Sequence, residues 1–385
     1  MSFYKRRPRQ LGSHTPNLWP VWLVAPLALV LVATFAYGLY QGADALLTSA
    51  NTGKKPVKVQ DVIKTTVTVL TLTGAVLAGL YAYRKQLLDE GASHRADATQ
   101  LAERYTAAAE QLGHDQPAVR LAGVYAMARL ADDWPEQRQV CIDVLCAYLR
   151  MPYAPDGAEE GFRKGEREVR LTIIRIISAH LQDPTKSATW CGYDLNFTGA
   201  VFDGGDFTGS FFSGGTVSFA HATFSGGTVF FTGSKFVGGT TSFTDSNFTG
   251  GTLAFLNSTF SGGSVYFTRS TLSDGTISFA NATFSGAKVV LSYTRFTGGS
   301  VFFVESKFSG GKVFFTGSPF SGSRVSFANA AFSGGTVFFT DSTFSRGTIT
   351  FTNATLSGGD VQFPNVRVRA AAVTDWGPFP AIPIS

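Results

Sequence analysis

Residues 217–236 read VSFAHATFSGGTVFFTGSKF, and the pattern in this stretch recurs as far as residue 363. The unit is V-x-F-x-x-S-x-F-x-G-G-T, and it returns every twelve residues. The first Phe of the unit keeps this step at Phe219, Phe231, Phe243, Phe255, Phe267 and Phe279, and again, after Leu291, at Phe303, Phe315, Phe327, Phe339, Phe351 and Phe363. Self-similarity at a short fixed period indicates a fold made of stacked repeats.

The spacing inside the unit indicates two short strands. Residues two apart in a strand point to the same side, so V-x-F and S-x-F each place a pair of side chains inward. The Gly pair supplies the backbone freedom that a tight corner requires. Stacked units would form a Phe ladder inside and pair their backbones from coil to coil, about 4.8 Å apart. We therefore expect a β-solenoid.

A shorter step of the same kind lies just upstream. Four Phe residues are five apart, and a Leu or a small residue lies two positions before each of them: Phe197, Phe202, Phe207 and Phe212, preceded by Leu195, Ala200, Gly205 and Ser210. This pattern resembles the pentapeptide-repeat family, and the resemblance covers about 190–363, close to half of the chain. It implies a right-handed, four-sided coil. The chain departs from the family after Phe212, where steps of five and seven alternate.

This departure leaves two possible coils. Two twelve-residue units per coil would give 24 residues, four faces and eight inward side chains, as the resemblance implies. A flat coil of one unit would have to place two Phe and one Val in a very thin core. We favour the coil of 24 residues.

Composition and charge exclude several classes of function. The net charge is +5, but from Trp190 onward ten Lys and Arg face nine Asp and Glu, so the solenoid is nearly neutral. The three cysteines, Cys141, Cys146 and Cys191, have neither disulfide nor metal-ligand spacing, and we expect buried, reduced thiols. The five histidines are scattered, and no phosphate-binding loop occurs. We predict no catalytic, cofactor-binding or metal-binding residue, no cofactor, and no enzyme activity.

The N-terminal part is predicted to enter a membrane. A basic tail, 1–16, precedes a predicted transmembrane hairpin, 17–85, because Leu18–Tyr40 and Thr65–Tyr83 are uncharged and long enough to span a bilayer. A signal peptide is the competing interpretation, but the first run is too long and lacks a clear cleavage site. Basic residues flank both outer ends of the hairpin, although the connecting loop also holds lysines. The balance predicts a multi-pass protein of a bacterial-type inner membrane with both termini in the cytoplasm.

The region 86–186 is predicted to be a small α-helical neck. One helix covers Ala96–Leu112, Asp115 caps a second with Pro117 in its first turn, Pro135 opens a third, and a fourth covers Glu166–Leu181. The fold class is therefore mixed and multi-domain: a transmembrane α-hairpin, this helical domain, and a right-handed β-solenoid of pentapeptide-repeat type over 187–366. The last helix, or Trp190, is placed to cover the open end of the first coil. Residues 367–385 form either a second cap or a flexible end.

Two surface features are candidates for function. The residue between V and F of each unit points outward, and it is aromatic at Phe230, Tyr266, Phe302, Phe314 and Phe338. An exposed aromatic row is a candidate partner-binding strip; the alternative is that these side chains pack under the tail, the helices or a second copy. The second feature is a Thr column at the corners, interrupted by Lys288, Lys312 and Arg324. Thr ladders occur in ice binding, but charges in the ladder and a cytoplasmic location argue against it.

The sequence favours a membrane-anchored, non-enzymatic scaffold or spacer that presents a rigid solenoid to a protein partner. The alternative is a DNA mimic that modulates a topoisomerase, as some pentapeptide-repeat proteins do. Such mimicry requires an acidic surface, which a neutral solenoid lacks. A membrane enzyme is the third class, and it would need a pocket with convergent polar groups. The expected partners are the lipid bilayer and an unidentified protein; a nucleic-acid partner is not expected, and self-association stays open.

Overall fold

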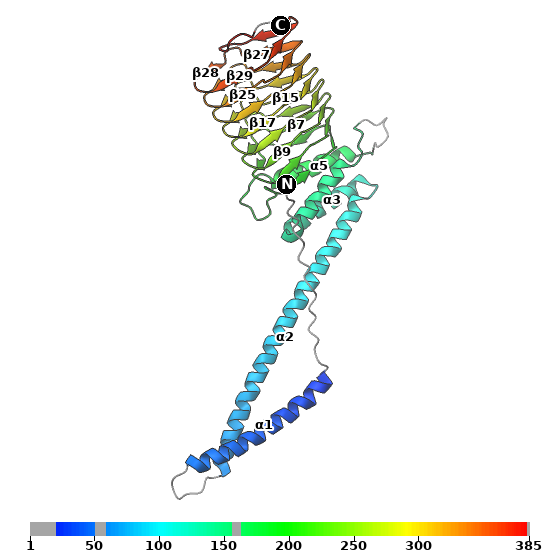
Figure 1. Ribbon diagram of the computed structural model, residues 1–385. Helices are drawn as coiled ribbons and strands as arrows, with labels where there is room; N and C mark the ends of the chain where they lie inside the picture. The colour runs from blue at the N-terminus through cyan, green and yellow to red at the C-terminus, as the bar shows by residue number, and fades with distance from the viewer. Residues whose placement is uncertain (1–20, 51–58, 156–162, 383–385) are drawn as a thin grey trace. The chain divides into compact units, whose positions relative to one another are not determined.

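The computed structural model describes residues 21–50, 59–155 and 163–382, and the chain divides into two compact units (Figure 1). The first unit extends to Asp97 and holds α1 (Val21–Ala50) and most of α2 (Val59–Leu112). The second begins at Ala98 with the end of α2 and holds the remaining helices and all the strands. The helix predicted over Ala96–Leu112 is therefore the last part of α2, a helix that begins much earlier.

The N-terminal unit presents apolar side chains on both helices. Leu31 and Phe35 of α1 and Leu72 and Leu80 of α2 are all more than half exposed. Within the part of the chain that the structure describes, one stretch, Thr66–Gln86, is long and apolar enough to cross a membrane, and it coincides with the second predicted span. The first predicted span begins at Leu18, outside the described residues, and from Val21 it is helical.

In the described residues of the helical domain there are three α-helices besides the end of α2. They are α3 (Pro117–Asp133), α4 (Arg138–Arg150), preceded by the 3₁₀ turn η1 (Pro135–Gln137), and α5 (Glu166–His180). The predicted cap at Asp115 is wrong. Pro117 occupies the first helical position, so Gln116 is the N-cap and its side chain makes no capping bond. The Asp115 carboxylate instead lies 3.4 Å from Arg163.

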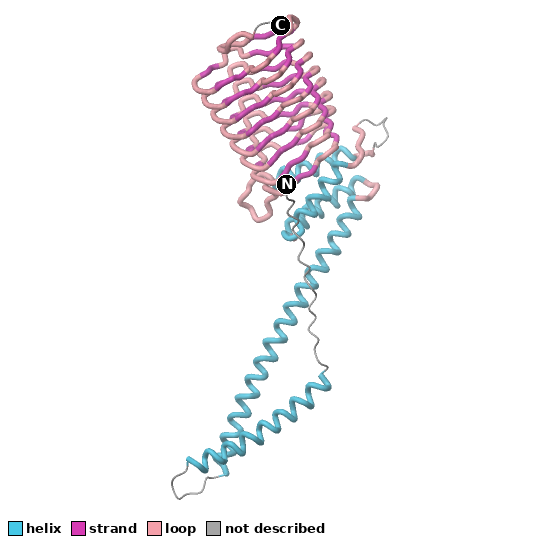
Figure 2. Tube along the Cα trace, in the orientation of Figure 1, coloured by secondary structure: helices cyan, strands magenta, loops and turns pink. Residues whose placement is uncertain are grey.

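Short parallel strands form four sheets along the solenoid (Figure 2). Sheet A contains β1 (Leu195–Asn196), β5 (Thr216–Ser218), β9 (Thr240–Ser242), β13 (Ser264–Tyr266), β17 (Lys288–Val290), β21 (Lys312–Phe314), β25 (Thr336–Phe338) and β29 (Asp360–Gln362). Sheet B contains β2 (Val201–Phe202), β6 (Thr223–Phe224), β10 (Asn247–Phe248), β14 (Thr271–Leu272), β18 (Arg295–Phe296), β22 (Pro319–Phe320), β26 (Thr343–Phe344) and β30 (Arg367–Val368).

The other two sheets complete the coil. Sheet C contains β3 (Gly205–Asp206), β7 (Thr228–Phe230), β11 (Thr252–Ala254), β15 (Thr276–Ser278), β19 (Ser300–Phe302), β23 (Arg324–Ser326), β27 (Gly347–Thr350) and β31 (Ala372–Asp375). Sheet D contains β4 (Phe211–Phe212), β8 (Lys235–Phe236), β12 (Thr259–Phe260), β16 (Thr283–Phe284), β20 (Lys307–Phe308), β24 (Ala331–Phe332) and β28 (Thr355–Leu356). The sheets follow one another around the coil, so A lies opposite C, and B opposite D.

The register confirms the longer coil. Thr216 pairs with Thr240, and Thr240 with Ser264, so each coil advances by 24 residues. The first coil is shorter, because Leu195 pairs with Val217. One coil therefore uses two twelve-residue units and presents four faces, and the flat twelve-residue coil is excluded.

The core consists of stacked aromatic rings. The Phe219 and Phe243 centroids are 4.7 Å apart with nearly parallel planes, and Phe243 and Phe267 repeat this geometry. Rings from the two halves of one coil meet edge to face, as Phe219 and Phe231 do at 6.0 Å. Leu291 and Leu272 replace Phe in these columns and are fully buried. Both ring geometries are favourable for aromatic pairs, so the columns hold successive coils together.

Buried hydroxyl groups connect successive coils. Where the residue two positions before the second Phe is a fully buried Ser or Thr, its hydroxyl donates to the carbonyl of the first Phe, or of Leu291 in that column, one coil back. Ser246 donates to Phe219 at 2.7 Å, and Ser270 donates to Phe243 at 2.6 Å. The bond recurs at Ser234, Ser258, Thr294, Ser306, Ser318 and Ser342. These bonds remove the cost of burying a hydroxyl group, which is why Ser is tolerated inside.

The turns between A and B and between C and D have a left-handed residue. Its φ lies between 53° and 59° at His221, Asp245, Asn257, Arg269, Asn281, Tyr293, Glu305, Asn329, Asp341, Asn353 and Asn365. Gly adopts this conformation most easily, and Asn and Asp adopt it more easily than the other residue types. Three of the five Asn-x-Ser/Thr sequences, at Asn257, Asn281 and Asn353, lie at these positions, so backbone geometry accounts for their Asn.

The helical domain covers the first coil, as predicted. The carbonyl of Leu181 accepts the Phe211 amide at 2.7 Å, and the Gln139 side chain bonds both the amide and the carbonyl of Asp194. Trp190 is fully buried and stacks on His180 at 4.2 Å. The helical domain and the solenoid thus share one hydrophobic core.

The last coil is also covered. β31 pairs with β27, and the chain then places Trp376 and Phe379 over the end of the core. Trp376 meets Phe363 edge to face at 4.9 Å, and Phe379 meets Phe351 at 5.1 Å. The tail is therefore a cap as far as Phe379 and not a flexible end; residues 383–385 lie outside the described residues.

Candidate interaction surface

The five predicted aromatic residues do not form one strip. Tyr266, Phe314 and Phe338 lie on sheet A, whereas Phe230 and Phe302 lie on the opposite sheet C. In Figure 1 the labels of β9, β17 and β25 follow one face, and those of β7 and β15 follow another. The prediction of a single row is wrong because a row along one face includes only every second unit.

Sheet A carries a continuous apolar row. Tyr266 pairs with Val290, Val290 with Phe314, and Phe314 with Phe338, so the four side chains occupy consecutive coils. The Phe314 and Phe338 rings stack at 4.8 Å and are half-buried. The sequence prediction missed Val290 because it selected aromatic residues only. We call Tyr266, Val290, Phe314 and Phe338 the sheet A row.

Two lysines lie beside the sheet A row. Lys288 and Lys312 pair with each other across β17 and β21, and both are exposed. The Lys288 ammonium lies 5.3 Å from the centre of the Phe314 ring, a cation–π distance. Among the described residues, neither lysine forms a salt bridge. Two like charges thus lie one coil apart without a carboxylate between them.

Sheet C carries an isolated version of this arrangement. The Arg324 guanidinium lies 6.0 Å from the centre of the Phe302 ring. The neighbours of Phe302 in the row are Ser278 and Ser326, so no apolar row continues on either side. Sheet C is therefore a natural comparison for sheet A.

Phe230 belongs to a different surface. Its side chain is 42% exposed and lines a shallow cavity of about 490 Å³ where α5 meets the solenoid, together with Arg167 and Arg175. Arg167 is held by Asp203 at 2.8 Å, and Arg175 lies 3.4 Å from Glu168. Carboxylates of the chain thus pair with both guanidinium groups, and the lining also holds Asp206, whose carboxylate accepts the Thr208 amide.

The Thr column also divides between two faces. Thr228, Thr252 and Thr276 pair in register on sheet C, whereas Thr216 and Thr240 lie on sheet A before Lys288 and Lys312. A regular Thr array is therefore three residues long on sheet C and two on sheet A before a non-Thr residue interrupts it. Thr arrays of only two or three residues do not add support for an ice-binding surface.

The charges of the solenoid are arranged in bands. Between Gly275 and Thr340 there are five basic residues, namely Lys288, Arg295, Lys307, Lys312 and Arg324, and a single acidic residue, Glu305. The other acidic residues lie outside this stretch, and Asp274 and Asp341 flank it directly. A solenoid that is neutral in total thus has a basic middle, and its sheet A face bears two of these charges beside the aromatic rings.

The polar groups buried in the helical domain are structural. Arg120 is fully buried 3.2 Å from Glu166, which also accepts the Tyr148 hydroxyl at 3.0 Å. Burial, with the Glu166 charge, raises the pKa of Tyr148 to about 12. This network joins α3, α4 and α5 inside the core. Within the described residues, no three His, Cys, Asp or Glu side chains gather as metal ligands would.

The cysteines agree with the sequence prediction in part. All three are free; Cys141 and Cys146 are fully buried, and Cys191 is half-buried. Burial raises the pKa of Cys141 to about 11 and that of Cys146 to about 12. A nucleophilic thiol needs a lowered pKa, so neither of these two groups is activated.

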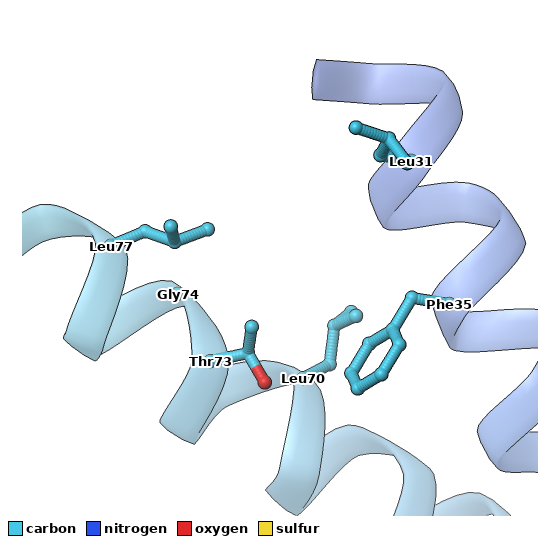
Figure 3. Close-up of a pocket in the computed structure, with 6 residues that line it drawn as sticks. All are labelled: Leu31, Phe35, Leu70, Thr73, Gly74 and Leu77. Carbon is cyan, nitrogen blue, oxygen red and sulfur yellow. The ribbon is translucent and has the colours of Figure 1, made fainter. Parts of the chain in front are cut away.

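The N-terminal unit has an apolar pocket. It measures about 490 Å³ and is lined by six residues of α1 and α2 (Figure 3): Leu31, Phe35, Leu70, Thr73, Gly74 and Leu77. The only side-chain hydroxyl, on Thr73, donates to the carbonyl of Val69 within its own helix. Among the described lining residues, no side-chain polar group is left without a partner.

Comparison of the chain with protein-family models, with curated proteins and with solved structures finds no match. What the fold establishes is the architecture: a parallel β-solenoid of about eight coils with regular Phe stacking, and helices at its N-terminal side.

Proposed function

We propose that this chain is a non-enzymatic scaffold or spacer of the pentapeptide-repeat type, anchored in a membrane and presenting its solenoid to a protein partner. The observation that supports this most directly is the sheet A row on a rod whose coils are joined by aromatic stacks and hydrogen bonds. Contiguous aromatic and apolar side chains on a rigid face have the composition of an interface centre, and the polar or charged residues beside them that of its rim.

The membrane part of the proposal rests on the N-terminal unit. Apolar side chains such as Leu72, Leu77 and Leu80 are more than half exposed, and water would make that exposure costly. A bilayer would cover them and accommodate a continuous helix. From the positions of the basic residues, we propose that both ends of the chain lie on the cytoplasmic side of a bacterial-type inner membrane.

The pentapeptide-repeat assignment rests on the coil. Four faces and eight inward side chains per coil are what the resemblance implies. The DNA-mimic alternative receives no support from the charges, because Lys288, Lys312 and Arg324 interrupt the rows where a mimic of the phosphate backbone would need carboxylates.

Membrane washing and cross-linking test this proposal. The tagged full chain should stay in the membrane pellet after an alkaline carbonate wash. Cross-linking in native membranes should capture protein partners that are lost when the chain is cut after Asp183. Release by carbonate would contradict the anchor, the absence of any solenoid-dependent partner would contradict the scaffold, and capture of a topoisomerase would favour the alternative.

A further inference from the structure

We propose that the sheet A face between β13 and β25 binds an acidic, apolar segment of a partner protein. The inference rests on the proposed scaffold function and names the chemistry of its partner. The face combines the sheet A row with Lys288 and Lys312. Two features carry the inference. One is an apolar row in which Tyr266, Phe314 and Phe338 are partly exposed to solvent, and the other is a pair of adjacent lysines that form no salt bridge among the described residues.

The lysines are the less expected of the two features. Lys288 and Lys312 lie directly opposite each other in neighbouring strands, an arrangement in which like charges repel. Thr or Ser occupies the equivalent position in four of the other strands of sheet A, at Thr216, Thr240, Ser264 and Thr336, and β29 has Asp360 there. The fold therefore does not require lysine. A carboxylate between the two ammonium groups would replace the repulsion with two attractions.

The aromatic side chains define the rest of the partner. Phe314 and Phe338 stack on each other and keep one side towards solvent, while Val290 is 8% exposed and fills the row between Tyr266 and Phe314. Ser218 and Ser242 hold the same row position nearer the neck, so the row could have been polar without loss of the fold. Leu, Phe or similar side chains of a partner would cover this surface.

Charge decides between the classes of partner. A second copy of the chain would bring the same two lysines to this face, and the acidic residue in their row, Asp360, lies two coils beyond Lys312, outside the face between β13 and β25. A nucleic acid would need a longer track of basic groups along its backbone, whereas this face has two. A protein segment with a few carboxylates and apolar side chains matches both features.

The matched controls are present in the chain. Lys288→Thr with Lys312→Thr, and Phe314→Ser with Phe338→Ser, install residues that the same rows of sheet A already contain. Arg324→Thr with Phe302→Ser makes the equivalent changes on sheet C, where the cation–aromatic pair is isolated. Circular dichroism and the unfolding midpoint confirm that each variant is folded before binding is compared.

The experiment measures fluorescence anisotropy with the full chain in detergent. The probes are labelled twelve-residue peptides that alternate Glu with Leu, Lys with Leu, or Ser with Leu. We expect binding of the Glu–Leu peptide, weakened at least tenfold by either sheet A variant and less than twofold by the sheet C variant. Raising the salt concentration should weaken binding to the parent chain but change it little for the lysine variant.

Several results would overturn the inference. Equal binding of the Lys–Leu peptide, equal losses for the sheet C variant, or stronger binding of a labelled oligothymidine would each do so. Mass photometry that shows dimers lost only in the sheet A variants would assign the face to a second copy. Cross-linked partners that the sheet A variants retain would also refute it while leaving the scaffold function intact. The scaffold function itself fails only if no solenoid-dependent partner is found.

Discussion

At the residue scale, the solenoid requires a particular backbone conformation at a position where the twelve-residue pattern specifies no residue type. The third residue of the F-x-x-S turn varies in sequence from Asn to Glu, Arg and Tyr, yet all of these residues adopt the same left-handed conformation. The pattern marks the turn, whereas the backbone angle becomes evident only when the coils are stacked. Stability should therefore respond to residue type at this exposed position.

Substitutions of Glu305 test how much this backbone requirement contributes to stability. Glu305 has φ of 57° and an exposed side chain. Glu305→Asn or Glu305→Gly should raise the free energy of unfolding by about 0.5–1 kcal/mol, because these residues adopt the left-handed region at lower cost, whereas Glu305→Val should lower it by about 1 kcal/mol or more. Urea denaturation measures the changes. Lys307→Val, two residues later in an extended strand, is the control and should change stability little; equal effects at both positions would contradict the prediction.

The buried Ser column tests a second residue-scale effect. The Ser270 hydroxyl donates to the Phe243 carbonyl and accepts the Ser246 amide at 3.1 Å, and Ser270→Ala removes both bonds. The Ser246 amide still reaches the Phe243 carbonyl at 3.3 Å, so we expect a loss of about 1 kcal/mol. Ser270→Val should cost about 1–3 kcal/mol by overpacking. The reverse change, Ala282→Ser, places a hydroxyl where the Phe255 carbonyl can accept it and should be neutral or stabilising. A destabilising Ala282→Ser in urea denaturation would show that the hydroxyl is not accommodated.

At the scale of elements, the two caps complete a core that the solenoid alone would leave open. The sequence predicted that the helix ending near Leu181 or the nearby Trp190 covers the first coil, because apolar residues follow the last helical stretch immediately before the repeats. It could not decide whether the proline-containing tail folds back. That depends on Trp376 and Phe379 meeting the last Phe rings, a long-range contact with no periodic signal.

The first cap can be tested through the buried thiols. Trp190→Ala should lower the free energy of unfolding by about 3–5 kcal/mol because it empties a fully buried site. In the parent chain Cys141 and Cys146 should resist alkylation at pH 8, and Cys191 should react first; in the variant the two buried thiols should react faster. Trp190→Phe is the control. Equal alkylation of all three thiols in the parent would contradict the packing.

The two buried thiols, Cys141 and Cys146, should make the free energy of unfolding decrease as the pH rises. Burial raises the pKa of Cys141 to about 11 and that of Cys146 to about 12, above the value of about 8.5 for an exposed thiol. Above about pH 8.5 the unfolded chain releases protons that the folded chain retains, so unfolding becomes more favourable. This contribution to stability is complete below about pH 8.5 and is lost as the pH approaches 11 to 12. Cys146→Ala should reduce the loss between pH 8 and 10.

At the scale of the whole molecule, the period of the sequence and the period of the structure differ by a factor of two. The twelve-residue unit is what the sequence repeats, but the coil needs two units, as the pairing of Thr276 with Ser300 shows. The sequence therefore predicted the core well, because every unit contributes the same inward side chains. It predicted the candidate surface poorly, because neighbouring units face opposite ways and Phe302 does not join Phe314.

This factor of two predicts how deletions move surfaces. Removing 276–287, one unit, should leave a continuous solenoid, because the next strand has the same inward residues. Everything beyond the deletion should rotate by half a coil, so that β19 stacks on β13 and Phe302 becomes the neighbour of Tyr266. Removing 276–299, the full step from Thr276 to Ser300, should instead keep Tyr266 and Phe302 on opposite faces.

Cysteines at these two positions measure the rotation. With Tyr266→Cys and Phe302→Cys, the shorter deletion should bring the two Cα atoms to about 4.8 Å, one coil apart. That separation is within the range of a disulfide, so oxidation should cross-link the pair. The undeleted chain and the longer deletion should not cross-link, because sheets A and C are separated by the core. Cross-linking in the undeleted chain would refute the four-sided coil, and its absence after the shorter deletion would show that the two halves of a coil are not interchangeable.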